Sequence, residues 1–144
     1  MTIHEALKVS IGHGLTDAQI DKLAAVCRLK KCAVNEDIIL QQSTDCDPFI
    51  VLLGNVRVSY YGKEIRKGKE GSLFGEIALI DNFPRSANVQ AVDACEVAFL
   101  PQAALEELFK VDPSIAAVAY KNIARAMCSK MRQSTNWSEG LMAK

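Results

Sequence analysis

The segment FGEIALIDNFPRSANV, at positions 74–89, combines residue types that can bind a charged small molecule. Gly75 has no Cβ atom, so a ligand or another stretch of backbone can approach it closely. Arg85 carries a planar, permanent cation that can donate two parallel hydrogen bonds to phosphate oxygens. Ser86 adds a hydroxyl group and a backbone amide next to it. Because apolar residues surround these groups, the segment is typical of a pocket wall.

The residues after Gly75, EIALI, are predicted to form one short helical turn. The amides of Ile77, Ala78 and Leu79 would lack intrahelical partners, and the positive end of the helix would help them to bind an anion. Glu76 would repel a simple phosphate, but a carboxylate can accept a hydrogen bond from a ribose hydroxyl. The sequence therefore predicts a ribose phosphate of modest charge. The nearby GKEGSLFGE does not match the Walker pattern of triphosphate sites.

Two spaced motifs carry a family resemblance: Phe74-Gly75-Glu76-Ile77-Ala78-Leu79, followed by Pro84-Arg85-Ser86-Ala87. Together they resemble the phosphate-binding cassette of cyclic nucleotide-binding domains. This family includes regulatory domains of cyclic-nucleotide-dependent kinases and gated channels, and the sensor half of the catabolite activator protein. The resemblance extends over roughly residues 15–133. The family often has glycines in the turns before its central strands, whereas this chain has Asn35 in one and STDCD in another.

The resemblance implies a role for each cassette residue. Glu76 would hold the ribose 2′-OH, and Arg85 and Ser86 would bind the cyclic phosphate. The remaining predicted ligand-binding residues are Gly75, Ile77, Ala78 and Ala87. Three further residues are candidates to cover the base: Phe74, Tyr120 and Arg125, with Trp137 a weaker one. Other interpretations remain: Glu76 as a first-turn acid complementing the helix dipole, and Arg85 as a structural ion pair with Asp81 or Asp93 that the ligand would displace.

The elements that must position this segment are mainly short strands. Segments of four to eight residues, rich in Val, Ile and aromatics and separated by turn residues, predict strands. They are LKKCAV, DIILQQ, PFIVLLG, NVRVSYYG, KEIRKG, ANVQAV and CEVAFL. Their number and spacing predict a mainly β fold, an antiparallel jelly-roll-like β-roll. The basic stretch GKEIRKGKEG is interpreted as a solvated hairpin.

Helices are predicted on both sides of the strands. One covers about residues 2–8, and Thr16 can cap a second that contains DAQIDKLAAVCRL. Pro101 leads a third, PQAALEELFKV. Asp112 and Pro113 then suit the start of a last helix, whose apolar stripe is Ile115, Ala116, Ala119, Tyr120, Ile123 and Met127. We expect one domain over 1–144, with its core at about 15–133 and a frayed polar tail at 134–144.

Composition excludes several classes of protein. The chain has 144 residues, 49% hydrophobic, and a formal net charge of zero, so it lacks the basic excess of a DNA-binding domain. Only eleven residues follow position 133, too few for a helix-turn-helix. No apolar run reaches the roughly 18–20 residues of a membrane span, and the N-terminus does not resemble a secretory signal. We therefore expect a cytoplasmic protein without direct DNA binding.

The cysteines and histidines do not suggest a metal site. Five cysteines are scattered without a C-x-x-C pair, and both histidines lie near the start of the chain. We expect reduced thiols packed as small hydrophobic residues, and neither a metal nor a cofactor. A redox role for Cys27 and Cys32 has no positive support.

The predicted function is a cyclic nucleotide sensor rather than an enzyme, because no nucleophile–base pair or metal set accompanies the cassette. The ligand would be cyclic AMP, favoured over cyclic GMP, and its binding would move the C-terminal helices. The expected partner is an effector protein or a missing effector domain, with a homodimer through the last helix as a further option. The alternative is a degenerate fold that serves as an interaction module and binds no nucleotide.

Overall fold

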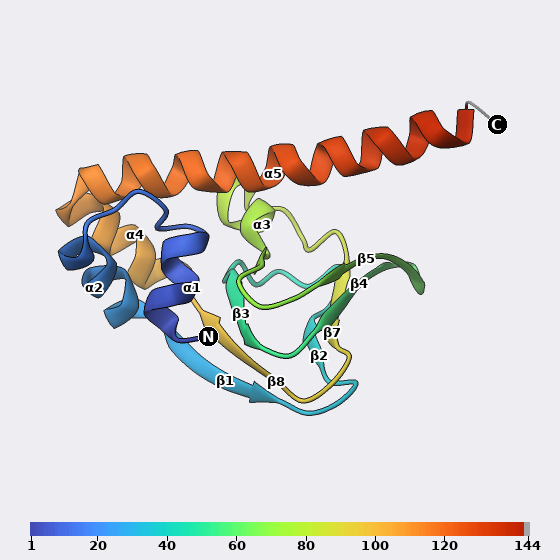
Figure 1. The fold of residues 1–144 in the computed structure, drawn as a ribbon, viewed down its shortest axis with the longest axis horizontal. Helices are drawn as coiled ribbons and strands as arrows, with labels where there is room; N and C mark the ends of the chain where they lie inside the picture. Colours follow the sequence, from blue (N-terminus) through green and yellow to red (C-terminus); the bar gives the residue numbers. More distant parts are fainter. Residues whose placement is uncertain (143–144) are drawn as a thin grey trace.

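The computed structural model describes the backbone of residues 1–142 and the side chains of residues 1–133. Eight strands form a β-roll, with helices gathered mainly on one side of it (Figure 1). In chain order the elements are α1 (Ile3–Val9), α2 (Asp17–Val26), β1 (Arg28–Cys32), β2 (Asp37–Ile39), β3 (Phe49–Leu53), β4 (Val56–Tyr60), β5 (Lys63–Gly68), β6 (Leu73–Phe74), α3 (Glu76–Asp81), β7 (Asn88–Ala91), β8 (Cys95–Phe99), α4 (Gln102–Val111) and α5 (Pro113–Met142).

The strands pair into two antiparallel sheets, in the orders β1-β8-β3-β6 and β2-β7-β4-β5. This confirms the predicted mainly β fold and its antiparallel roll, and each of the seven predicted segments overlaps a strand. The sequence missed β6, which has two residues and is too short for a periodic pattern. Its pairing places Phe74 opposite Phe49 of β3, and the two rings stack with their centroids 5.6 Å apart. The start of the cassette is thereby fixed to the roll.

Two hydrophobic cores lie side by side. One fills the roll between the sheets and includes Phe49, Val51 and Phe74. The other lies between the helices and the outer face of the first sheet, and includes Ile50, Leu79 and Ile123. Because Phe74 belongs to the first core and Leu79 to the second, the cassette lies where the roll meets the helices.

The helices begin at or next to the predicted positions, although α4 begins at Gln102, so that Pro101 is its N-cap rather than its first residue. Thr16 and Gln19 form a reciprocal capping box at the start of α2. The amide of Ile115 donates to the carbonyl of Asp112 at the start of α5. In Figure 1, α5 passes over α3 and continues beyond the β4–β5 hairpin.

The prediction of a frayed tail over 134–144 was wrong for the backbone up to Met142, which continues α5. No proline interrupts the sequence after Pro113, so each further residue adds one hydrogen bond to an existing helix. The side chain of Trp137 and residues 143–144 lie outside the described residues. Over residues 1–142, no helix combines the length and the apolar character that crossing a membrane requires.

The cysteines are free thiols. Cys32 and Cys95 are buried opposite each other on β1 and β8, and burial raises the pKa of both. Burial also raises the pKa of Cys27 to about 11. All three thiols therefore stay protonated near neutral pH and pack as small hydrophobic groups.

Candidate ligand-binding site

A cavity of about 310 Å³ opens between the cassette, the second sheet and α5. This volume lies within the range of small-molecule sites, about 300–1,000 Å³. Eight of the residues singled out in the sequence line it: Phe74, Gly75, Glu76, Ile77, Ala78, Arg85, Ser86 and Ala87. The structure therefore brings the two spaced motifs together around one space.

Gly75 is required by the backbone and by its contact with Arg85. Its φ angle is +81°, in the left-handed region that favours glycine. A Cβ atom at this position would lie 2.7 Å from Nη1 of Arg85, and Nη1 itself donates to the Gly75 carbonyl at 2.8 Å. The glycine thus lets the arginine lie directly against the backbone of the cassette.

The Arg85 side chain is only 3% exposed, and its guanidinium forms hydrogen bonds with several segments of the chain. Besides Gly75, its guanidinium donates from Nη2 to the Asp45 carboxylate at 2.9 Å and to the Asp47 carbonyl at 2.6 Å. Backbone hydrogen bonds join Arg85 to Gln42 and Ser43 in the same loop. The Nε atom is buried and has no partner. Arg85 thus donates four hydrogen bonds, three from its guanidinium and one from its backbone amide, and the Nε–H donor is left without a partner.

The alternative interpretation of Arg85 named the wrong partners, because the guanidinium pairs with neither Asp81 nor Asp93 among the described contacts. Asp81 accepts a hydrogen bond from the amide of Phe83, and Asp93 accepts one from the amide of Asn55. The partner is instead Asp45, in the STDCD loop where the sequence departs from the family pattern. Burial acts to raise the pKa of Asp45, but hydrogen bonds from Arg85 and Ser43 outweigh it, so the pKa lies below its ordinary value.

Glu76 is 1% exposed, and its partner comes from a distant part of the chain. Its Oε1 atom accepts a short hydrogen bond from Nζ of Lys130 in α5, and Oε2 is buried without a partner. Nζ of Lys130 also donates to the Leu73 carbonyl at 3.0 Å and lies 5.0 Å from the centre of the Phe74 ring. Burial lowers the pKa of Lys130, and the charge of Glu76 opposes this shift.

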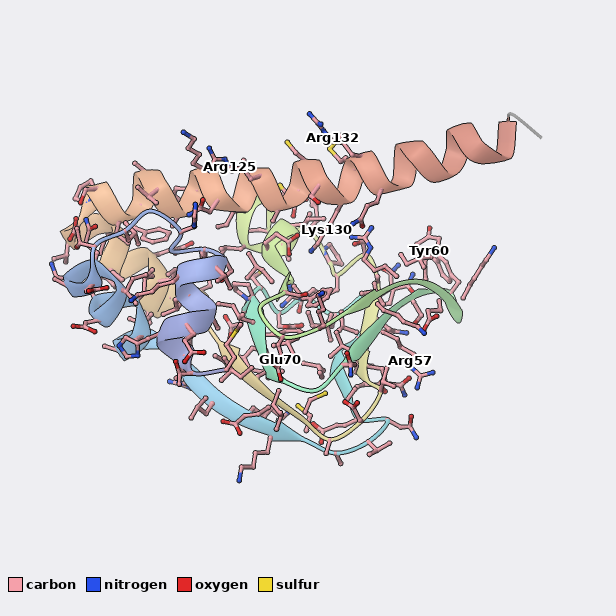
Figure 2. All side chains as sticks on the ribbon, in the orientation of Figure 1. Arg57, Tyr60, Glu70, Arg125, Lys130 and Arg132 are labelled. Carbon is pink, nitrogen blue, oxygen red and sulfur yellow. The ribbon has the colours of Figure 1, made fainter. Side chains whose placement is uncertain are left out.

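The sequence reasoning missed Lys130, although its spacing holds a signal. Lys130 lies seven residues after Ile123 and three after Met127, so it falls on the apolar stripe of the last helix. A lysine that continues an apolar stripe must reach water or a buried acid. Figure 2 shows Lys130 on the side of α5 that faces the roll and Arg132 on the other side.

The two base candidates from α5, Tyr120 and Arg125, are not among the described residues that line the cavity. The ring of Tyr120 packs edge-on against Phe109 of α4, with centroids 5.1 Å apart. Arg125 borders a separate hollow between α1 and α5. From the predicted solvated hairpin, however, Ile65 and Arg66 reach the cavity wall.

The cavity wall therefore contains two buried side chains, Arg85 and Glu76, that are each incompletely paired. Arg85 retains an unpaired N–H group, and Glu76 retains an unpaired carboxylate oxygen. Leaving such atoms unsatisfied is costly. The pair suits a ligand that carries an acceptor at one end and a hydroxyl at the other.

Known regulatory and channel proteins, and the profile of one protein family, are similar to this chain in sequence. Residues 30–112, more than half of the chain, match the profile described as the cyclic nucleotide-binding domain. The chain is 34% identical over 96 residues to the cAMP-dependent protein kinase regulatory subunit of Yarrowia lipolytica, covering 63% of this chain and 26% of that protein. It is 30% identical over 95 residues to the potassium channel AKT2 of Oryza sativa, covering 62% of this chain and 11% of the channel.

A solved structure is also similar to this chain. The regulatory domain of Toxoplasma gondii PKA, crystallised with cAMP, superposes with a TM-score of 0.71 at 27% identity, covering 85% of this chain and 49% of that one. Both curated relatives are regulatory or channel proteins several times longer than the aligned region. With its β-roll, its cassette and these matches, the chain belongs to the cyclic nucleotide-binding domain family.

Proposed function

We propose that this chain is a regulatory sensor that binds a 3′,5′-cyclic purine nucleotide, with cyclic AMP favoured over cyclic GMP. One observation carries the proposal: Arg85 and Glu76 line the same cavity, and each retains one unpaired buried polar atom. A cyclic nucleotide has a phosphate acceptor and a 2′-hydroxyl donor on one rigid bicyclic unit. It can therefore satisfy both atoms at once.

In this proposal Arg85 binds the cyclic phosphate. The guanidinium is permanently charged, and a charge-assisted hydrogen bond from a buried donor is about twice as strong as a neutral one. Ser86, and Ile77 and Ala78 of α3, line the same cavity and would add a hydroxyl and backbone amides. Ala87 leaves room for the phosphate because its side chain is small.

The other end of the site would hold the ribose. Oε2 of Glu76 would accept the hydrogen bond from the 2′-hydroxyl, because Oε1 already accepts from Lys130. The preference for the cyclic over the linear nucleotide would follow from charge, since a linear monophosphate carries more negative charge beside the Glu76 carboxylate.

The purine would lie against other apolar residues of the cavity wall, among them Val58, Ile65 and Val89. These side chains offer no hydrogen-bond acceptor for the extra amino group of guanine. Cyclic AMP is accordingly the favoured ligand, and the similarity to a kinase regulatory domain crystallised with cAMP supports this choice.

Binding would act on the C-terminal helices. The phosphate would draw α3 inward, and Leu79 of α3 shares a core with Leu105 and Ile123 of the last two helices. A movement of α3 would therefore repack α4 and α5, which would signal to an effector protein or to an effector domain of the same gene product. A ligand shifts such an equilibrium only by its difference in affinity for the two states.

Isothermal titration with cyclic AMP, cyclic GMP and linear 5′-AMP tests the proposal. We expect saturable binding of one cyclic AMP per chain, weaker binding of cyclic GMP, and weaker binding still of 5′-AMP. If the folded protein bound none of the three, the function would instead be that of an interaction module.

A further inference from the structure

We propose that Lys130 is a positioning residue of the ligand site, which prepares Glu76 for the ribose and ties α5 to the cassette. This role rests on the proposed cyclic nucleotide binding. The juxtaposition behind it is specific: a lysine from the last helix is bonded to one oxygen of a fully buried cavity carboxylate and leaves the other oxygen unpaired.

The first step of the argument concerns charge. Glu76 is 1% exposed, and within the described residues Lys130 is the partner recorded for its carboxylate. A buried carboxylate without a counter-charge is strongly unfavourable. The ammonium group of Lys130 offsets that charge, so that the Glu76 carboxylate is tolerated in its buried position.

The second step concerns orientation. The Lys130 ammonium group is itself fixed, because it donates to the Leu73 carbonyl and lies over the face of the Phe74 ring. A fixed donor on Oε1 sets the rotation of the carboxylate group. The remaining oxygen, Oε2, is then held in one position, and it is the atom proposed to accept from the 2′-hydroxyl.

The third step concerns space. Lys130 lines the cavity of about 310 Å³, and this space is present while the Lys130–Glu76 pair is formed. The pair therefore does not have to break for a ligand to enter. A shift of α3 toward the ligand would instead carry Lys130, and with it α5, in the same direction.

The test compares Lys130→Met with the wild-type protein, using calorimetry with cyclic AMP and with 2′-deoxy cyclic AMP. Methionine keeps the apolar stem but removes the ammonium group. We expect the affinity for cyclic AMP to fall at least about tenfold. The affinity for the 2′-deoxy nucleotide, which cannot donate to Glu76, should fall less than about threefold, a difference that a purely structural role would not produce.

Three further variants control this comparison. Lys121→Met alters an exposed lysine on the same helix, nine residues earlier and thus on the opposite face, and should leave both affinities unchanged. Lys130→Arg restores a cation and should recover part of the lost affinity. Lys130→Gln serves if the methionine variant does not fold; because its neutral amide can still donate to Oε1, its loss of affinity should be smaller, but again larger for cyclic AMP than for the 2′-deoxy nucleotide.

The outcomes separate this inference from the proposed function. If the wild-type protein binds no cyclic nucleotide, the proposed function is wrong, and the role of Lys130 is wrong with it. If the wild-type protein binds cyclic AMP and the Lys130 variants bind it equally well or more tightly, only the positioning role is overturned. An equal loss for both nucleotides would overturn it as well.

Discussion

The two ends of the cavity are built in different ways. The Arg85 end is assembled within the roll, from the cassette and the loop that contains Asp45 and Asp47. The Glu76 end depends on Lys130, which lies 54 positions later in the chain on the last helix. The Arg85 end should therefore keep its geometry if α5 moves, whereas the Glu76 end should not. Coupling between ligand and helix is expected at the Glu76 end.

The largest expected effect lies at the Arg85 end. Arg85→Ala removes the permanent cation from a buried phosphate, which should weaken the binding of cyclic AMP by about 2–5 kcal/mol. Isothermal titration measures the change, with circular dichroism to confirm folding. Arg28→Ala, at an exposed position of β1, is the matched control. An unchanged affinity in a folded Arg85→Ala protein would remove Arg85 from the site.

A smaller loss is expected at the Glu76 end. Glu76→Gln removes the charge that Lys130 and the 2′-hydroxyl both contact, and binding of cyclic AMP should weaken by about 1.5–3 kcal/mol. The loss should nearly disappear when the titration is repeated with 2′-deoxy cyclic AMP. Glu70→Gln changes an exposed glutamate (Figure 2) and should have no effect. Equal losses for both nucleotides would argue against contact between Glu76 and the ribose.

The contact between the Gly75 backbone and Arg85 can be tested by substituting the glycine. Gly75 and Gly62 both have φ angles of +81°, but a Cβ atom would meet Arg85 at Gly75 and nothing within 4 Å at Gly62. Alanine at either position should lower the free energy of unfolding by about 1–3 kcal/mol because of the strained backbone. Only Gly75→Ala should also weaken cyclic AMP binding. Thermal unfolding and titration of both variants separate strain from the contact, and equal affinities would contradict it.

The smallest effect concerns the pH dependence of stability at the Arg85 end. The pKa of Asp45 is lowered from its ordinary value of 3.8, so its contribution to stability is present above that value and is lost as the pH falls through the folded-state pKa. Asp45→Asn should therefore reduce the loss of stability on acidification below about pH 4. Chemical unfolding at several pH values measures this. Asp37→Asn, on the exposed start of β2, is the control, and identical acid profiles for Asp45→Asn and wild type would argue against the pair.

The same contrast explains what could be predicted from the sequence. The strands, the helix starts and the cassette are encoded locally, by alternation, by caps such as Thr16, and by the spacing of Gly75, Glu76 and Arg85. Asn35 adopts a left-handed conformation, with φ at +67°, and so takes the place that a glycine often has in a turn.

What could not be predicted depends on contacts between distant segments. Asp45 was missed because nothing in the letters STDCD indicates which arginine they face. Lys130 was missed because a lysine in a helix is usually solvated, and only the fold shows that its side of α5 lies over a buried acid. The strand β6 was missed because two residues form it only when Phe49 and Ile50 are there to pair with them.

The central claim is that Arg85 and Glu76 bind opposite ends of one sugar-phosphate unit. A crystal structure of the protein with cyclic AMP tests it most directly. The account predicts a phosphate oxygen within about 3.2 Å of a guanidinium nitrogen of Arg85, and the 2′-oxygen within about 3.0 Å of the Glu76 carboxylate. A nucleotide bound elsewhere, or one whose ribose and phosphate contact neither side chain, would contradict it.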